Sequence, residues 1–135
     1  MKIDSTKVVV AANQEMVASF LKDSQNLIHM LPKDQIADWK ATNEECSFKV
    51  QGAVVISLIQ DGHEGTSKIF MKSGVKSPFP FRLTIHLESQ GDSTNGYIAF
   101  DGEVNVFLKM MVEKPLTALF NIMSENLKKH FDQQQ

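Results

Sequence analysis

The stretch Pro115–Phe131, PLTALFNIMSENLKKHF, decides the fold of this chain because its pattern is that of one long amphipathic helix. Pro115 suits the first turn of a helix, where its missing N–H costs no hydrogen bond. The basic run Lys128–His130 suits the negative end of the helix dipole. Apolar residues recur at steps of three and four and so share one face: Leu116, Leu119, Phe120, Met123, Leu127 and Phe131. Such a helix needs a broad apolar surface to lie against.

The segments before Val112 predict strands that supply this surface. Ile3–Val10 predicts a first strand, Asn13 is a plausible cap for a short helix, and a second short helix ends before Pro32. Polar loops such as Asp61–Gly65 and Gly91–Gly96 favour antiparallel hairpins, with the first strand at the sheet edge. Gly52 predicts a bulge or bend. About six strands follow the helices: Ile36–Thr42, Cys46–Gln51, Val54–Gln60, Thr66–Ser73, Phe81–Glu88 and Tyr97–Leu108.

Composition narrows the class of protein. The 135 residues, 42% hydrophobic and 22% charged, predict a single domain over 1–135. A net charge of −2 gives no basic footprint for nucleic acid. Cys46 is the only cysteine, which excludes an internal disulfide and favours a reducing, cytoplasmic location. Met1–Ser5 carries no apolar leader, and no apolar run approaches the roughly 18 residues of a membrane span.

The stretch Val8–Asp23, VVVAANQEMVASFLKD, followed by Asn26-Leu27 and Leu31-Pro32, resembles the opening of the START-like (SRPBCC) superfamily. Gly102–Met111, leading into Pro115-Leu116, resembles its end. That superfamily includes polyketide cyclases, the birch-pollen allergen and lipid-transfer domains. The resemblance implies an α+β helix-grip fold: a seven-stranded curved antiparallel sheet, two short N-terminal helices and a long C-terminal helix over a hydrophobic cavity.

The chain departs from the family pattern at two places near the expected cavity mouth. Asn13 stands where a proline often follows the alanines, and His29-Met30 stands where a tryptophan often precedes the Leu-Pro pair. Residue parity and the resemblance together predict a ligand-binding lining, although the same pattern also fits a plain packed core. Its members are His29, Met30, Trp39, Phe48, Val54, Ile56, Ile69, Met71, Phe81, Leu83, Ile85, Ile98, Phe100, Leu116, Phe120, Met123 and Leu127.

No catalytic residue, metal or cofactor is predicted. Cys46 falls on the apolar side of its strand, which indicates a buried, inert thiol, and one cysteine with scattered histidines lacks zinc-ligand spacing. His63 lies in a predicted hairpin loop, His86 on an outer sheet face and His130 at a helix end. The carboxylates are interpreted as solvated, including the pairs Asp34 with Asp38 and Asp101 with Glu103.

We expect a protein that binds or carries a small hydrophobic molecule such as a lipid, polyketide or isoprenoid, as a monomer or weak dimer. One alternative is an enzyme of the cyclase or dehydratase kind, with His29 or Tyr97 as acid or base. A second is an interaction module that docks through the outer sheet face or through Leu108–Val112. A solid core together with an exposed apolar patch would favour this second alternative.

Overall fold

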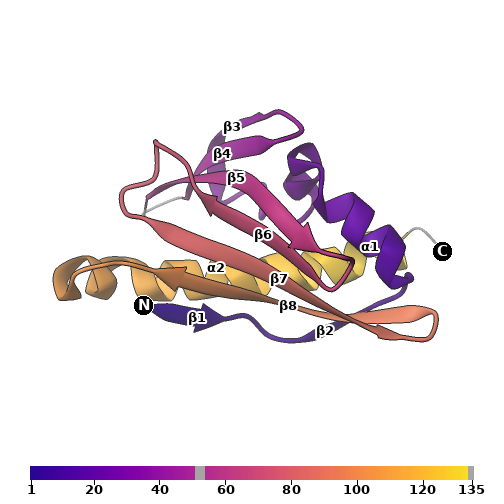
Figure 1. Cartoon of the computed structure of the whole chain (residues 1–135). Helices are drawn as coiled ribbons and strands as arrows, with labels where there is room; N and C mark the ends of the chain where they lie inside the picture. The colour runs from indigo at the N-terminus through magenta and orange to yellow at the C-terminus, as the bar shows by residue number, and fades with distance from the viewer. Residues whose placement is uncertain (51–53, 134–135) are drawn as a thin grey trace.

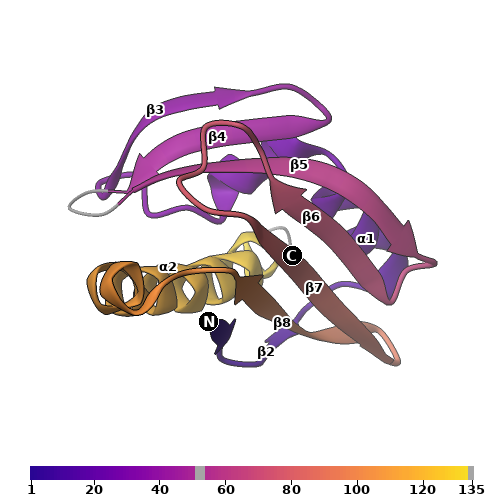
Figure 2. The ribbon, with the colours of Figure 1, turned by 60° about the vertical axis from the view of Figure 1, so that its left-hand side comes forward.

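The chain forms one curved antiparallel sheet that wraps over a long helix (Figures 1 and 2). The structure is a computed structural model, and it describes residues 1–50 and 54–133. The strands run in the order β1-β8-β7-β6-β5-β4-β3, with β2 also paired to β8. The elements are β1 Lys2–Asp4, β2 Val8–Val10, α1 Gln14–Leu21, the 3₁₀ helix η1 Ser24–His29, β3 Ile36–Ala41, β4 Glu45–Val50, β5 Val55–Glu64, β6 Lys68–Ser73, β7 Phe81–Gln90, β8 Ser93–Gly102 and α2 Val106–Asp132.

Alternation along the strands separates an inner face from an outer face. In β7, Phe81, Leu83 and Ile85 are buried, whereas Arg82 and Glu88 are exposed. The buried stripe of α2 lies against the inner face, as the helix-grip prediction requires: Val112, Leu116, Leu119, Phe120, Met123, Ser124, Leu127 and Phe131. Sheet and helix therefore bury their apolar sides against each other.

The described sheet has eight strands rather than seven because the predicted first strand, Ile3–Val10, is interrupted. Asp4 pairs with Ala99 and Val8 pairs with Gly96, so the three residues 5–7 face only the two residues 97–98 of β8. Such an extra residue is a bulge, which breaks the ladder locally. The Ser5 hydroxyl fills the break by accepting a hydrogen bond from the Ile98 N–H at 2.8 Å. Both halves stay at the sheet edge, as predicted.

The long helix begins nine residues earlier than predicted, at Val106 instead of Pro115, and the final strand ends at Gly102 instead of Leu108. Asn105 caps the helix, because its Oδ1 accepts a hydrogen bond from the Leu108 N–H at 2.8 Å. The dense apolar run through Val112 predicts a strand. In the structure the run is helical, and its apolar residues lie on both sides of the helix. Pro115 consequently lies inside α2, where it has no N–H to donate to the preceding turn.

Two hairpin boundaries also differ from the sequence prediction. β5 continues through the predicted loop to Glu64, with an irregular register between Gln60 and His63. At the other end, β8 already starts at Ser93, so the turn is shorter than Gly91–Gly96. Gly91 has φ 65°, a left-handed conformation that suits a glycine at this tight turn. The bend predicted at Gly52 lies outside the described residues.

Candidate ligand-binding interior

The structure brings most of the predicted lining residues together between the sheet and α2. Fourteen of the seventeen are buried, with at most 4% of their surface exposed: Met30, Phe48, Ile56, Ile69, Met71, Phe81, Leu83, Ile85, Ile98, Phe100, Leu116, Phe120, Met123 and Leu127. Five adjacent strands, β4 to β8, contribute such residues, as in the register pairs Phe48↔Ile56, Ile69↔Ile85↔Ile98 and Met71↔Leu83↔Phe100. One continuous apolar surface therefore faces the helix.

These side chains fill the space that they enclose. The ring of Phe100 lies 5.0 Å from the ring of Phe120 on α2 and 5.0 Å from that of Phe81, measured between centroids. Phe79 packs edge-on against Phe100 at 6.3 Å. A void of ligand size would leave the surrounding side chains accessible to water, and these residues are not. A molecule enters this interior only where side chains or α2 give way.

A small polar cluster interrupts the apolar interior at the break between β1 and β2. The Ser124 hydroxyl of α2 lies 2.7 Å from the Ser5 hydroxyl, and both residues are buried. Next to them, the Thr6 N–H donates to the Asn121 Oδ1 at 2.9 Å. Sequence reasoning missed this cluster, although the position of Ser124, four residues after Phe120, places it on the buried face of the helix.

Three predicted lining residues are more exposed than the others, although two of them, Trp39 and Val54, still pack against the core. His29 is exposed at the end of η1, where its ring lies 4.9 Å from that of His130 on α2. Trp39 is half-buried on β3 with its ring 6.2 Å from Phe48. Val54 is half-buried just before β5.

His130 belongs to a small ring cluster where α1, η1 and the end of α2 meet. The ring of Phe20 lies 4.6 Å from that of His130 and 5.3 Å from that of Phe131. Burial, together with the neighbouring His29, lowers the pKa of His130 below its ordinary value of 6.5. The uncharged imidazole is therefore the form that this packing favours.

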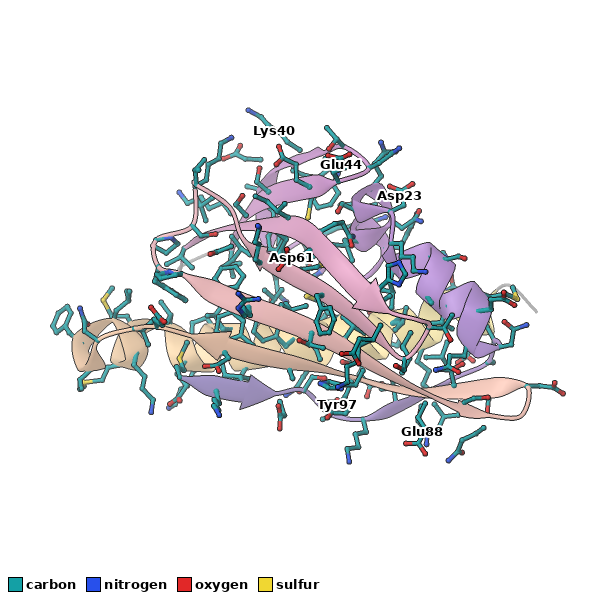
Figure 3. All side chains as sticks on the ribbon, in the orientation of Figure 1. Asp23, Lys40, Glu44, Asp61, Glu88 and Tyr97 are labelled. Carbon is teal, nitrogen blue, oxygen red and sulfur yellow. The ribbon has the colours of Figure 1, made fainter. Side chains whose placement is uncertain are left out.

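Tyr97, the other acid or base considered, lies on the outer face of the sheet. It stacks on its cross-strand partner His86 with ring centroids 4.6 Å apart, and the Lys7 ammonium lies 5.5 Å from the Tyr97 ring centre. Burial and Lys68 lower the pKa of His86, while Asp4 acts in the opposite direction. Figure 3 shows Tyr97, Glu88 and Asp61 among the side chains of this face. Tyr97 has no access to the apolar interior from there.

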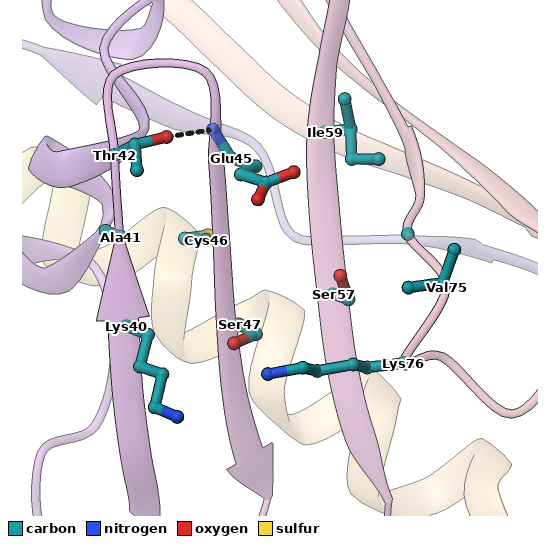
Figure 4. A pocket seen from close by; sticks show the side chains of 11 residues that line it. Lys40, Ala41, Thr42, Glu45, Cys46, Ser47, Ser57, Ile59, Val75 and Lys76 are labelled. Atoms are coloured by element: carbon teal, nitrogen blue, oxygen red, sulfur yellow. Dashed lines mark hydrogen bonds between the residues drawn. The ribbon is translucent and has the colours of Figure 1, made fainter.

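Four hollows formed by described residues lie on the outside of the molecule. The one in Figure 4, of about 310 Å³, lies between β3–β5 and the segment after β6, with Lys40, Glu45 and Lys76 at its rim. Others lie beside Tyr97, beside Arg82 and beside Phe20. Of the predicted lining residues, Phe81 alone borders one of these four hollows. Three of them, those beside Lys40, Tyr97 and Arg82, carry side chains of both charges.

Cys46 is buried at the inner side of β4, as predicted. Burial, with a smaller effect of Glu45, raises the pKa of its thiol to about 12, which keeps it protonated and unreactive. Within 1–50 and 54–133, the histidine, cysteine and acidic side chains form no cluster of three or more that could hold a metal ion. No helix in the same residues is long and apolar enough to span a bilayer.

The sequence of the chain matches no protein-family profile and no curated protein. Its structure is similar to many solved structures. A START superfamily protein from Mycobacterium smegmatis superimposes with a TM-score of 0.71 at 16% identity over 99% of both chains. The KanY protein superimposes with a TM-score of 0.76 at 15% identity over 98% of this chain and 97% of that one.

Norcoclaurine synthase from Thalictrum flavum, solved with dopamine and hydroxybenzaldehyde, gives a TM-score of 0.70 at 13% identity over 100% of this chain and 88% of that one. At such identities the similarity concerns the fold. Together with the curved sheet closed around α2, these matches show that the chain has the helix-grip fold of these structures.

Proposed function

We propose that this protein binds a small hydrophobic molecule between the inner face of its sheet and α2. The observation that carries the proposal is the continuous apolar surface on β4–β8, which faces an equally apolar side of α2. Its buried polar groups are hydroxyls, such as those of Ser5 and Ser124, which suit one weakly polar group on an otherwise apolar ligand. The fold shared with START superfamily proteins supports the same class of ligand.

Binding is favoured over catalysis by the chemistry of this interior. In the part of the chain that the structure describes, the buried polar residues are four serines and one threonine: Ser5, Ser24, Ser57, Thr94 and Ser124. A hydroxyl acts as acid or base only with a partner of suitable pKa. His29 and Tyr97, considered for that role, lie outside. We also propose a cytoplasmic location, from the single buried thiol, and a monomer or weak dimer.

The filled state of the interior limits affinity. Burying about ten methylene groups of a ligand contributes roughly 8 kcal/mol. The costs of association and of moving protein side chains are subtracted from that amount. We therefore expect a dissociation constant no tighter than about micromolar for a simple alkyl chain.

The methionines of the chain allow a direct test by ¹³C-methyl NMR with laurate as the probe. Met30, Met71 and Met123 are buried in or beside the interior, whereas Met110 and Met111 are exposed on α2. We expect saturable shifts of the Met71 and Met123 methyl signals at one laurate per chain. Assignment comes from single Met→Leu variants, which conserve side-chain volume. The proposal is wrong if these two signals stay unchanged up to the solubility limit of laurate.

Mass spectrometry of the native protein, purified from its own host, adds an independent measurement. A hydrophobic molecule that stays with the protein and is displaced by laurate would identify the chemical class of the natural ligand. A ligand that shifts only Met110 and Met111 would bind on the surface of α2 and not between the sheet and the helix.

A further inference from the structure

The first two turns of α2 carry an exposed apolar cluster that the fold does not use. Val106, Phe107, Met110 and Met111, here called the apolar tip, are 60–79% exposed. Their spacing places them on one side of the helix, whereas Val112 and Leu116, 1% and 0% exposed, turn towards the sheet. Together the four side chains offer on the order of 500 Å² of apolar surface, a size at the upper end of the largest apolar patch on a typical monomer, which is often functional.

The apolar tip is a formed helix with an ordered start. Asn105 caps it through its side chain, and its carbonyl accepts a hydrogen bond from the Lys109 N–H at 3.0 Å. Lys109 and Glu113, 3.7 Å apart, form an ion pair along the helix. The four apolar side chains are therefore held outward by regular helical geometry.

The position of the apolar tip decides what kind of surface it suits. Figures 1 and 2 show this end of α2 at the outer limit of the molecule, beyond the ends of β1 and β8. It is a convex projection, so a rigid protein partner would need a groove to receive it. Its area is also below the roughly 800 Å² per partner of a stable protein interface. A lipid surface deforms around a projection, so it requires neither a preformed groove nor an interface of that area.

Charge and residue type agree with a lipid surface. Phe107 and the two methionines are large and apolar, and the exposed Lys114 beside them has a long side chain that can reach phosphate groups. Lys114 also ends the apolar side, which limits insertion to the first two turns, about 10 Å of helix. The net charge of −2 gives no general attraction to anionic lipid, so the apolar contact must supply the binding energy.

We propose that the apolar tip of α2 inserts into the surface of a lipid bilayer and holds the protein there reversibly. The same helix continues from the tip into the buried stripe at Val112 and Leu116. An inserted tip would therefore place the lipid beside the end of α2 that leads into the interior. This proposal does not depend on the interior binding a ligand, and the two are measured separately.

Flotation with phosphatidylcholine vesicles tests the proposal. We expect wild-type protein to float with the vesicles, and the Phe107→Ser/Met110→Ser variant to lose at least tenfold in the fraction bound. Val75→Ser is the matched control, because Val75 is fully exposed and lies on the loop between β6 and β7 instead of the tip. It should float as the wild type does. Circular dichroism verifies that each variant is folded.

A tryptophan at the tip reports insertion directly. Trp39→Phe removes the only native tryptophan, so that Phe107→Trp then supplies the only tryptophan fluorescence. With vesicles this fluorescence should shift to the blue, and brominated lipid should quench it. Wild-type protein that stays unbound at millimolar lipid would overturn the proposal, as would equal flotation of the double variant. A dimer that the double variant abolishes, without any flotation, would instead assign the tip to a second copy of the chain.

Discussion

The Ser124 hydroxyl on α2 and the Ser5 hydroxyl between β1 and β2 lie 2.7 Å apart inside an otherwise apolar interior. Ser5 has one proton, which it donates to the Thr6 carbonyl at 3.1 Å, so Ser124 is the donor to Ser5. Ser5 also accepts from the Ile98 N–H at 2.8 Å. This chain of hydrogen bonds joins the edge of the sheet to the helix that the sheet encloses.

Removing either hydroxyl should destabilise the fold, but by different amounts. Ser124→Ala removes one neutral hydrogen bond and should cost about 1 kcal/mol. Ser5→Ala also leaves the buried Ile98 N–H without its acceptor and should cost about 2–3 kcal/mol. Urea unfolding measures both. Ser67→Ala, which removes an exposed turn hydrogen bond, is the control and should change stability little. Equal losses for the two buried serines would contradict the added cost of leaving the Ile98 N–H without its acceptor.

Acid should destabilise the contact between α1, η1 and the end of α2. The pKa of His130 is lowered in the folded state, so the unfolded chain binds more protons just below pH 6.5. The contribution of His130 to the free energy of unfolding is therefore fully present above pH 6.5. It is lost as the pH drops through the folded-state pKa. His86, whose pKa is also lowered, acts in the same direction. We expect this decline in denaturant titrations between pH 7.5 and 5.

His130→Phe isolates the contribution of one histidine. A phenyl ring keeps the packing on Phe20 and Phe131 but cannot be protonated. The variant should lose part of the pH dependence and keep the part that His86 causes. An unchanged slope would show that His130 titrates alike in both states.

Sequence periodicity predicted the sheet faces well, because alternation is a local property of each strand. The inner positions of β7, the buried side of Cys46 and the outer position of Tyr97 all followed from it. The start of α2 did not follow from periodicity, because Val104–Val112 has an apolar pattern that fits both a strand and a helix. Only the Asn105 cap marks the change from strand to helix. The Ser5–Ser124 contact joins residues far apart in sequence, which no local pattern reveals.

Pro115 lies inside α2, about one turn after the exposed tip. In the interior of a helix it deprives the preceding turn of a donor, a defect worth up to about 3 kcal/mol. Pro115→Ala should therefore stabilise the helix, by about 1–2 kcal/mol once the greater freedom of the unfolded chain is subtracted. Amide hydrogen exchange of residues 106–114 measures this stabilisation, because these residues form the turns of the helix before Pro115. Faster exchange there in the variant would contradict it.

Phe120 provides the most sensitive test of how tightly the interior is filled. Its ring is buried and lies against Phe100, so Phe120→Ala should cost about 3–5 kcal/mol. The same change creates apolar space between the sheet and α2, where a small apolar molecule such as benzene can bind. We expect benzene to raise the unfolding temperature of the variant and to leave that of the wild type unchanged.

The control for this change is Phe107→Ala, which removes the same ring from the exposed tip. It leaves no cavity, so its stability should stay within about 0.5 kcal/mol of the wild type, and benzene should have no effect. If Phe120→Ala costs as little as Phe107→Ala, the interior around Phe120 already has room to spare. The wild type would then accept a ligand without moving its side chains. Its dissociation constant for laurate should in that case be tighter than the micromolar value expected when side chains must move.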